Sequence, residues 1–155
     1  MKVFIGGSIS IKQLDNTVKN ELSKLINGNN EILVGDAYGV DSLVQKYYYD
    51  KGFRNVTVYT CNRRPRNNIG DFQVKYITPS IGLYGREFYA QKDRAMSYDC
   101  NFALMIWDGT SIGTLENIRR LAKYGVSIDI YLSKNNQIIQ IKNYNDYKKF
   151  KEQIQ

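Results

Sequence analysis

Three short turns carry the residues of this sequence that are best suited to chemistry. They read GGS at residues 6–8, GDAYG at residues 35–39 and DGTSIGT at residues 108–114, and each follows a hydrophobic run. Glycine lets a backbone approach a ligand closely, and the amides that begin a helix bind phosphate. The hydroxyls of Ser8, Ser111 and Thr114 are further donors. One such turn has an ordinary explanation, with Ser111 as a helix cap and Gly109 as a turn residue, but three together favour a phosphate site.

The residue types exclude several kinds of catalysis. The chain has no histidine, which removes Ser-His-Asp and Cys-His nucleophiles and the usual zinc sites. Cys61 and Cys100 lack CxxC spacing and are expected to be reduced structural thiols. Neither GxxxxGK[ST] nor GxGxxG occurs, which disfavours ATP hydrolysis and ordinary NAD-dependent redox chemistry. We therefore expect no cofactor and no metal, and any chemistry has to use carboxylates, Lys, Tyr, Ser or backbone dipoles.

The composition predicts a single globular domain spanning residues 1–155. With 43% hydrophobic residues, the chain can bury a substantial core. No apolar run approaches the ~20 residues of a membrane helix, and no signal peptide pattern begins the chain, so we expect a cytoplasmic protein without a membrane partner. The net charge of +7 indicates an anionic partner, and a nucleotide and a nucleic acid both qualify.

The elements that position the three turns alternate between strand and helix patterns. Strand patterns at 2–5, 31–34, 56–60, 101–107 and 127–132 alternate with helical periodicities at 14–26, 40–48, 85–97 and 111–123. Residues 61–84 hold both prolines and predict a long irregular segment with one short strand near 74–77. Residues 137–141 predict an antiparallel edge strand, and residues 144–154 a closing helix.

This alternation predicts an α/β fold, a Rossmann-like, mostly parallel sheet with helices on both faces. Ligands of such sheets bind beyond the carboxyl ends of the strands, where the strand order reverses. All three turns should lie on that edge.

Four segments together resemble the SLOG superfamily of Rossmann-like domains: FIGGS, VGDAYGVDSLVQKY, KDRAMSYDCNFALMIWDGTSIGTLENIRRLA and VSIDIYL. The resemblance covers about residues 2–132. The YspA-type pattern is the most similar, with G-x-x-x-G-x-D at residues 35–41 and D-G-x-S-x-G-T at residues 108–114. The superfamily also includes the lonely guy (LOG) phosphoribohydrolases, the DprA core and, more distantly, nucleoside deoxyribosyltransferases.

The resemblance implies binding of a nucleoside phosphate or an ADP-ribose-like molecule, by a sensor or a sequestering protein that pairs as a homodimer. Lys92 and Arg94 stand in KDRAM, where YspA-type members have R-N-x-x-M. The turns and the resemblance together imply these nucleotide-binding residues: Gly6, Gly7, Ser8, Gly35, Asp36, Ala37, Gly39, Asp41, Lys92, Arg94, Asp108, Gly109, Ser111, Gly113, Thr114 and Asn117.

The sequence departs from the enzymes of the superfamily at one position. Their turn reads G-T-x-x-E, with a catalytic glutamate, whereas here Asn117 stands at that place and Glu116 comes one residue earlier. A helical step of about 100° should turn Glu116 in a different direction. Asn117 can hydrogen-bond a ribose hydroxyl but cannot act as a nucleophile or a general base. Glu87, Glu116 and Asp41 are the remaining catalytic candidates, although each also has an explanation as a helix-terminal or turn residue.

Three functions follow from these observations. The first is nucleotide binding without cleavage; the second is a nucleoside 5′-phosphate N-glycosidase, which releases a base. The third is DprA-like nucleic-acid binding, although the basic residues are spread along the chain without one dense patch. Two further features stay open between ligand contact and structure: the basic cluster at residues 63–66, and the aromatic residues Tyr38, Tyr84, Tyr89 and Trp107.

Overall fold

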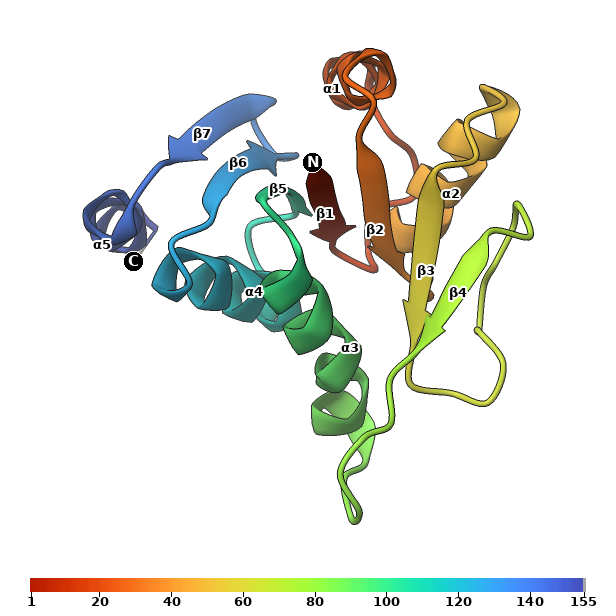
Figure 1. Ribbon diagram of the computed structural model, residues 1–155. Helices are drawn as coiled ribbons and strands as arrows, with labels where there is room; N and C mark the ends of the chain where they lie inside the picture. Colours follow the sequence, from red (N-terminus) through yellow and green to blue (C-terminus); the bar gives the residue numbers. More distant parts are fainter. Residues whose placement is uncertain (155) are drawn as a thin grey trace.

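The computed structural model describes residues 1–154 and consists of a seven-stranded sheet between two layers of helices (Figure 1). The elements in chain order are β1 (Lys2–Gly7), α1 (Asn16–Asn27), β2 (Glu31–Gly35), α2 (Val40–Asp50), β3 (Val56–Thr60), β4 (Gln73–Tyr76), α3 (Gly85–Asp99), β5 (Phe102–Trp107), α4 (Ile112–Lys123), β6 (Ser127–Leu132), β7 (Gln137–Ile141) and α5 (Tyr144–Gln153). None of the helices described within residues 1–154 combines the length and the apolar character that a membrane crossing requires.

The sheet has the strand order β4-β3-β2-β1-β5-β6-β7. All neighbouring strands are parallel except β6 and β7, which are antiparallel. The predicted α/β class, with its antiparallel edge strand near the C-terminus, is confirmed. The order reverses at β1, because β2 lies on one side of it and β5 on the other. A ligand crevice is expected at this reversal.

Side chains alternate between two hydrophobic cores. Phe4 of β1 belongs to the core under α3, α4 and α5, together with Met96 and Ile118. Its neighbours Val3 and Ile5 belong to the core under α1 and α2. Strands buried on both faces read as continuous apolar runs, which explains the uninterrupted FALMIW of β5. Each fully buried large apolar side chain contributes about 1.5–3 kcal/mol to folding.

The sheet extends further at one of the predicted turns than the sequence indicated. β1 was expected to end at residue 5, but it continues to Gly7 because Gly6 and Gly7 pair with Met105 and Ile106 of β5. Two of the three residues of the first turn are therefore part of a strand. The expected short strand in residues 61–84 is present as β4, which pairs with β3 at the edge of the sheet.

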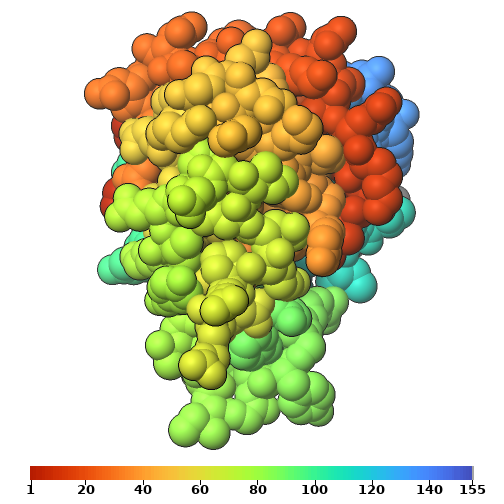
Figure 2. All heavy atoms as spheres, turned by 90° about the vertical axis from the view of Figure 1, so that its right-hand side faces the viewer, coloured from red at the N-terminus to blue at the C-terminus, as the bar shows by residue number. Residues whose placement is uncertain are grey.

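The segment between β3 and α3 covers one end of the sheet. Figure 2 shows these yellow to green residues spread over the face beside β3 and extending beyond the rest of the molecule. Its second half is exposed, with Ile81 and Tyr84 in contact with solvent. Its first half folds back towards the carboxyl ends of β2 and β3, where it meets the candidate site.

Candidate functional site

A cavity of about 630 Å³ lies at the carboxyl edge of the sheet, beside the strand reversal at β1 and β5. Its walls come from the end of β1, the loop that enters α2, the segment after β3, and the facing parts of α3 and α4. Eleven of the nucleotide-binding and catalytic candidates line it: Gly6, Gly7, Ser8, Ala37, Asp41, Lys92, Ser111, Gly113, Thr114, Glu116 and Asn117.

Ser8 joins the three turns. Its amide donates to the carbonyl oxygen of Ile106 at 3.0 Å, and its carbonyl oxygen accepts from the amide of Val40 at 3.3 Å. Its Oγ accepts from the amide of Asp108 at 3.1 Å and lies 3.5 Å from Oγ1 of Thr114. The turn after β1 is therefore bonded to the starts of both α2 and α4, which holds the cavity rim in place.

Two glycines of the turns are required by packing. A Cβ at Gly7 would lie 2.3 Å from the carbonyl oxygen of Ile106. Gly39 has a φ of +72°, and a Cβ there would lie 2.5 Å from the backbone of Ile9. Gly113 is different, because a Cβ there would have no neighbour within 4 Å. Of these three glycines, Gly113 alone has open space at its Cβ position, and it lines the cavity.

The start of α4 offers unbonded amides beside this open space. Leu115 donates the first backbone hydrogen bond of the helix, to Ser111 at 3.3 Å, so the amides before it have no intrahelical acceptor. Ser111 is the N-cap residue but makes no side-chain cap, because its hydroxyl donates to Asp108 at 2.8 Å. The N-terminus of a 12-residue helix carries a partial positive charge that favours an anion.

Asp108 stabilises the turn to which it belongs. Its carboxylate accepts hydrogen bonds from the amides of Thr110 at 2.9 Å and Ser111 at 2.7 Å, and from the hydroxyl of Ser10 at 2.6 Å. Burial alone would raise the pKa of Asp108, but these hydrogen bonds hold it well below the usual range. Asp108 and Gly109 shape the turn and do not line the cavity.

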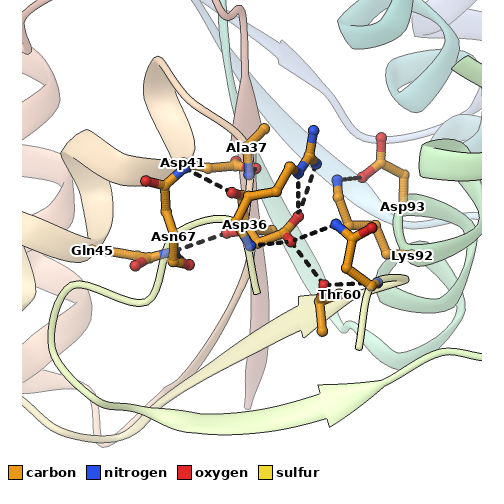
Figure 3. Close-up of polar contacts among 11 residues, drawn as sticks. Asp36, Ala37, Asp41, Gln45, Thr60, Asn67, Lys92 and Asp93 are labelled. Atoms are coloured by element: carbon orange, nitrogen blue, oxygen red, sulfur yellow. Dashed lines mark hydrogen bonds and ion pairs between the residues drawn. The ribbon is translucent and has the colours of Figure 1, made fainter. Parts of the chain in front are cut away.

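A buried charged cluster forms the opposite wall (Figure 3). Nζ of Lys92, a residue that is 4% exposed, lies 2.8 Å from Oδ1 of Asp93. Asp41 accepts from the amide of Ala37 at 3.1 Å. A Cβ at Gly35 would lie 2.4 Å from Oδ2 of Asp41 and 2.9 Å from Nζ of Lys92, so both charged groups need a glycine at this position.

The cluster shifts the pKa values of its members. Burial would lower the pKa of Lys92, but the charges of Asp93 and Asp41 outweigh it and raise the pKa. Burial raises the pKa of Asp41 to about 6, although the positive charge of Lys92 opposes the shift. Lys92 is therefore a firmly charged ammonium, and Asp41 is a carboxyl group that titrates close to neutral pH.

Asp36 does not line the cavity, and it holds the segment after β3. It is fully buried, and its carboxylate accepts from Oγ1 of Thr60 at 2.7 Å and from the amide and Nη2 of Arg66 at 2.9 and 2.8 Å (Figure 3). Burial would raise the pKa of Asp36, but these bonds lower it. The Arg66 guanidinium lies 4.0 Å from the ring centroid of Tyr89 on α3. Asp36 thereby holds Arg66 in the cavity wall beside Tyr89.

Asn117 links the two helices that face each other across the cavity. It is 6% exposed. Its Nδ2 donates to Asp93 of α3 at 3.2 Å, and its Oδ1 accepts from Nη1 of Arg120 at 2.7 Å. Glu116 was expected to face elsewhere, but it also lines the cavity, and it lies 3.7 Å from Arg86. The cavity extends along α3 and α4, so both Glu116 and Asn117 line it although they are neighbours on the helix.

The remaining candidates lie outside the cavity, and some residues that line it were not among the candidates. Gly35, Asp36, Gly39, Arg94, Asp108, Gly109 and Glu87 do not line it, and Arg94 and Glu87 are exposed on α3. Sequence reasoning missed Arg86, Asp93 and Arg120 as cavity residues. Arg120 follows Asn117 by three positions and Gly113 by seven, the spacing of one helix face, and this signal could have identified it.

The raised pKa of Asp41 predicts a pH-dependent stability. The folded state binds this proton more tightly than the unfolded chain, with a pKa of about 6 against 3.8. The contribution of Asp41 to stability is therefore complete below pH 3.8 and is lost as the pH rises through 6. A shift of this size corresponds to about 3 kcal/mol. Urea unfolding from pH 4 to pH 7 should show the unfolding free energy falling.

In Asp41→Asn most of that slope should vanish. Asp129, whose pKa burial also raises, leaves a slope of the same sign in the variant. The lowered pKa values of Asp36, Asp99 and Asp108 act in the opposite direction, because their contributions are lost as the pH falls below 3.8. Identical slopes between pH 4 and 7 in wild type and variant would contradict the raised pKa of Asp41.

Comparison with known proteins supports the fold. No protein-family model and no curated protein matches the sequence. Among solved structures, the chain is similar to one with a Rossmann-like α/β fold. That structure is DNA processing protein A from Helicobacter pylori, described for its mode of single-stranded DNA binding. It superimposes with a TM-score of 0.65 and 15% sequence identity, over all of this chain and 74% of the other. At this identity the similarity shows a shared fold.

Proposed function

We propose that this protein binds a nucleotide or a nucleotide-derived molecule, with a phosphate group on the first amides of α4. The observation that carries the proposal is the open space beside Gly113 at the start of α4. The Cβ position of Gly113 is open, the residue lines the cavity, and it belongs to the unbonded first turn of α4. Backbone amides of this kind, at a strand reversal, suit phosphate.

The size and charge of the cavity support this ligand class. A volume of about 630 Å³ lies within the range of about 300–1,000 Å³ that is typical of small-molecule sites. Tyr89, held against Arg66, offers a ring for a base. The cationic lining residues outnumber the acidic ones by five to three; they are Lys12, Arg66, Arg86, Lys92 and Arg120, against Asp41, Asp93 and Glu116.

The polar contacts of the cavity favour holding a ligand over cleaving it. Asn117 occupies the position at which the resemblance implies a catalytic glutamate, and its amide is bonded to Asp93 and Arg120. Asp93 is neutralised by Lys92. A nucleoside 5′-phosphate N-glycosidase needs a carboxylate free to stabilise the sugar cation. Glu116 pairs only loosely with Arg86, and it is the residue to test if base release is observed.

Single-stranded DNA binding is a second candidate, and the structural similarity to DNA processing protein A from Helicobacter pylori favours it. A strand would present its phosphates to the same cationic wall. Binding that weakens steeply with salt indicates many phosphate contacts, whereas a single nucleotide makes few. Titration of an oligothymidylate at two salt concentrations separates the two candidates.

Gly113→Leu should weaken nucleotide binding without loss of stability. The new side chain enters open space and blocks access to amides whose bonds to a charged group are worth about 1.5–3 kcal/mol. Affinity in isothermal titration with nucleoside 5′-monophosphates should fall by roughly 30-fold or more. Replacing a helical glycine should also raise stability by about 0.5–1 kcal/mol.

The matched control is Ile112→Leu, which places the same side chain one residue earlier, at an exposed position outside the cavity. This variant should bind as the wild type does. Undiminished affinity in Gly113→Leu, or no nucleotide binding by the wild type, would overturn the proposal. Chromatography of the titrated samples detects any free base, which would establish hydrolysis.

A further inference from the structure

We infer that the ligand of this cavity carries two phosphates separated by a nucleoside, one on the first turn of α4 and the other on Arg120. This inference rests on the proposed function, and it specifies the class of nucleotide. Arg120 comes from α4 and lines the same cavity as Gly113.

Arg120 forms no ion pair within residues 1–154. It is partly buried, and burial lowers its pKa even though Asp93 opposes the shift. Its only hydrogen bond within residues 1–154 joins Nη1 to the neutral Oδ1 of Asn117, at 2.7 Å. No carboxylate of these residues lies within 4.0 Å of it. A desolvated guanidinium without an anion is unfavourable, and a phosphate bound there would complete its contacts.

Two of the other four cations of the cavity are already paired, and a third, Lys12, is exposed to solvent. Lys92 pairs with Asp93 at 2.8 Å, and Arg66 pairs with Asp36 at 2.8 Å. Arg86 is held only loosely, 3.7 Å from Glu116, and its side chain is 60% exposed. Among residues 1–154, Arg120 is therefore the partly buried cation of the cavity that lacks an ion pair.

The spacing along α4 determines which ligand reaches both places. Arg120 follows Gly113 by seven residues, a rise of about 10 Å along the helix axis. Side chains tilt towards the helix N-terminus, which brings the guanidinium somewhat nearer to the first turn. The adjacent phosphates of a diphosphate share one oxygen and lie closer together than two phosphates on the 5′ and 3′ oxygens of a nucleoside. A wide separation therefore favours the nucleoside, either as a free bisphosphate or as one unit of a short strand.

The test compares four probes by isothermal titration at one salt concentration: adenosine 5′-monophosphate, adenosine 5′-diphosphate, adenosine 3′,5′-bisphosphate and a 5′-phosphorylated adenine dinucleotide. The bisphosphate should bind about ten-fold more tightly than the monophosphate, and the diphosphate should gain much less. Arg120→Gln should remove the gain of the bisphosphate over the monophosphate, when both are titrated into the same variant. A gain for the dinucleotide as well indicates that the unit is recognised within a strand; a gain for the bisphosphate alone indicates a free ligand.

Arg119→Gln is the matched control, because Arg119 is the exposed neighbour on the same helix and does not line the cavity. It loses the same charge and should keep the gain. Arg120→Lys should keep part of it. The inference is overturned if the bisphosphate binds no better than the monophosphate, or if Arg119→Gln and Arg120→Gln lose the gain equally. Failure of every probe, including the monophosphate, would instead overturn the proposed function.

Discussion

Lys92→Met should destabilise the protein by about 3–5 kcal/mol, the cost of removing one partner from a buried ion pair. Lys92 is 4% exposed and lies 2.8 Å from Asp93. Its charge also offsets that of Asp41. Without the ammonium group, the carboxylates of Asp41 and Asp93 repel each other and lose the cation that offsets their charge. Urea unfolding of wild type and variant at pH 7.5, followed by circular dichroism, measures the difference.

Two further variants show whether charge is the cause. Adding Asp41→Asn to Lys92→Met removes one of the repelling carboxylates and should recover at least about 1 kcal/mol. Lys46→Met is the matched control. Lys46 makes an ion pair of the same 2.8 Å length with Asp50, but its side chain is 64% exposed, and an exposed pair contributes about 0.3–0.5 kcal/mol. Equal losses in Lys92→Met and Lys46→Met would contradict the description of a buried charged cluster.

The fold was largely predictable because its signals are local. A fully buried parallel strand such as Phe102–Trp107 has to be a continuous apolar run, and a helix such as Ile112–Lys123 has to present apolar residues at helical spacing. The extension of β1 to Gly7 was missed because its cause is not local. The pairing of Gly7 with Ile106 joins residues that lie far apart in the sequence, and glycines are ordinarily signs of a turn.

The location of the candidate site could also be predicted, since parallel strands bring their carboxyl ends to one edge. The roles of single residues could not. Gly7, Gly35 and Gly39 were expected to approach a ligand, but their missing Cβ atoms make room for other parts of the protein. The bonds of Asp36 to Arg66 connect residues 30 positions apart. No local pattern distinguishes such a carboxylate from one that binds a ligand.

Asp36→Ala should cost about 3–5 kcal/mol, and it should release the segment that follows β3. The carboxylate of Asp36 is fully buried, and the variant leaves the amide and guanidinium of Arg66 and the hydroxyl of Thr60 without their acceptor. Hydrogen exchange of wild type and variant should show faster exchange in residues 61–72. Exchange in the strands β1 and β5 should change only with global stability.

The segment has a second anchor, which makes the expected change specific. Gln45 donates to the carbonyl oxygen of Asn67 and accepts from the amide of Ile69, at 3.1 and 2.9 Å, so the part near these residues should stay protected longer than Arg66. Asp50→Ala, which removes an exposed carboxylate, is the control and should leave the exchange unchanged. Because Asp36 holds Arg66 against Tyr89 in the cavity wall, Asp36→Ala should also weaken nucleotide binding. Unchanged exchange in residues 61–72 would mean that Asp36 does not hold the wall together.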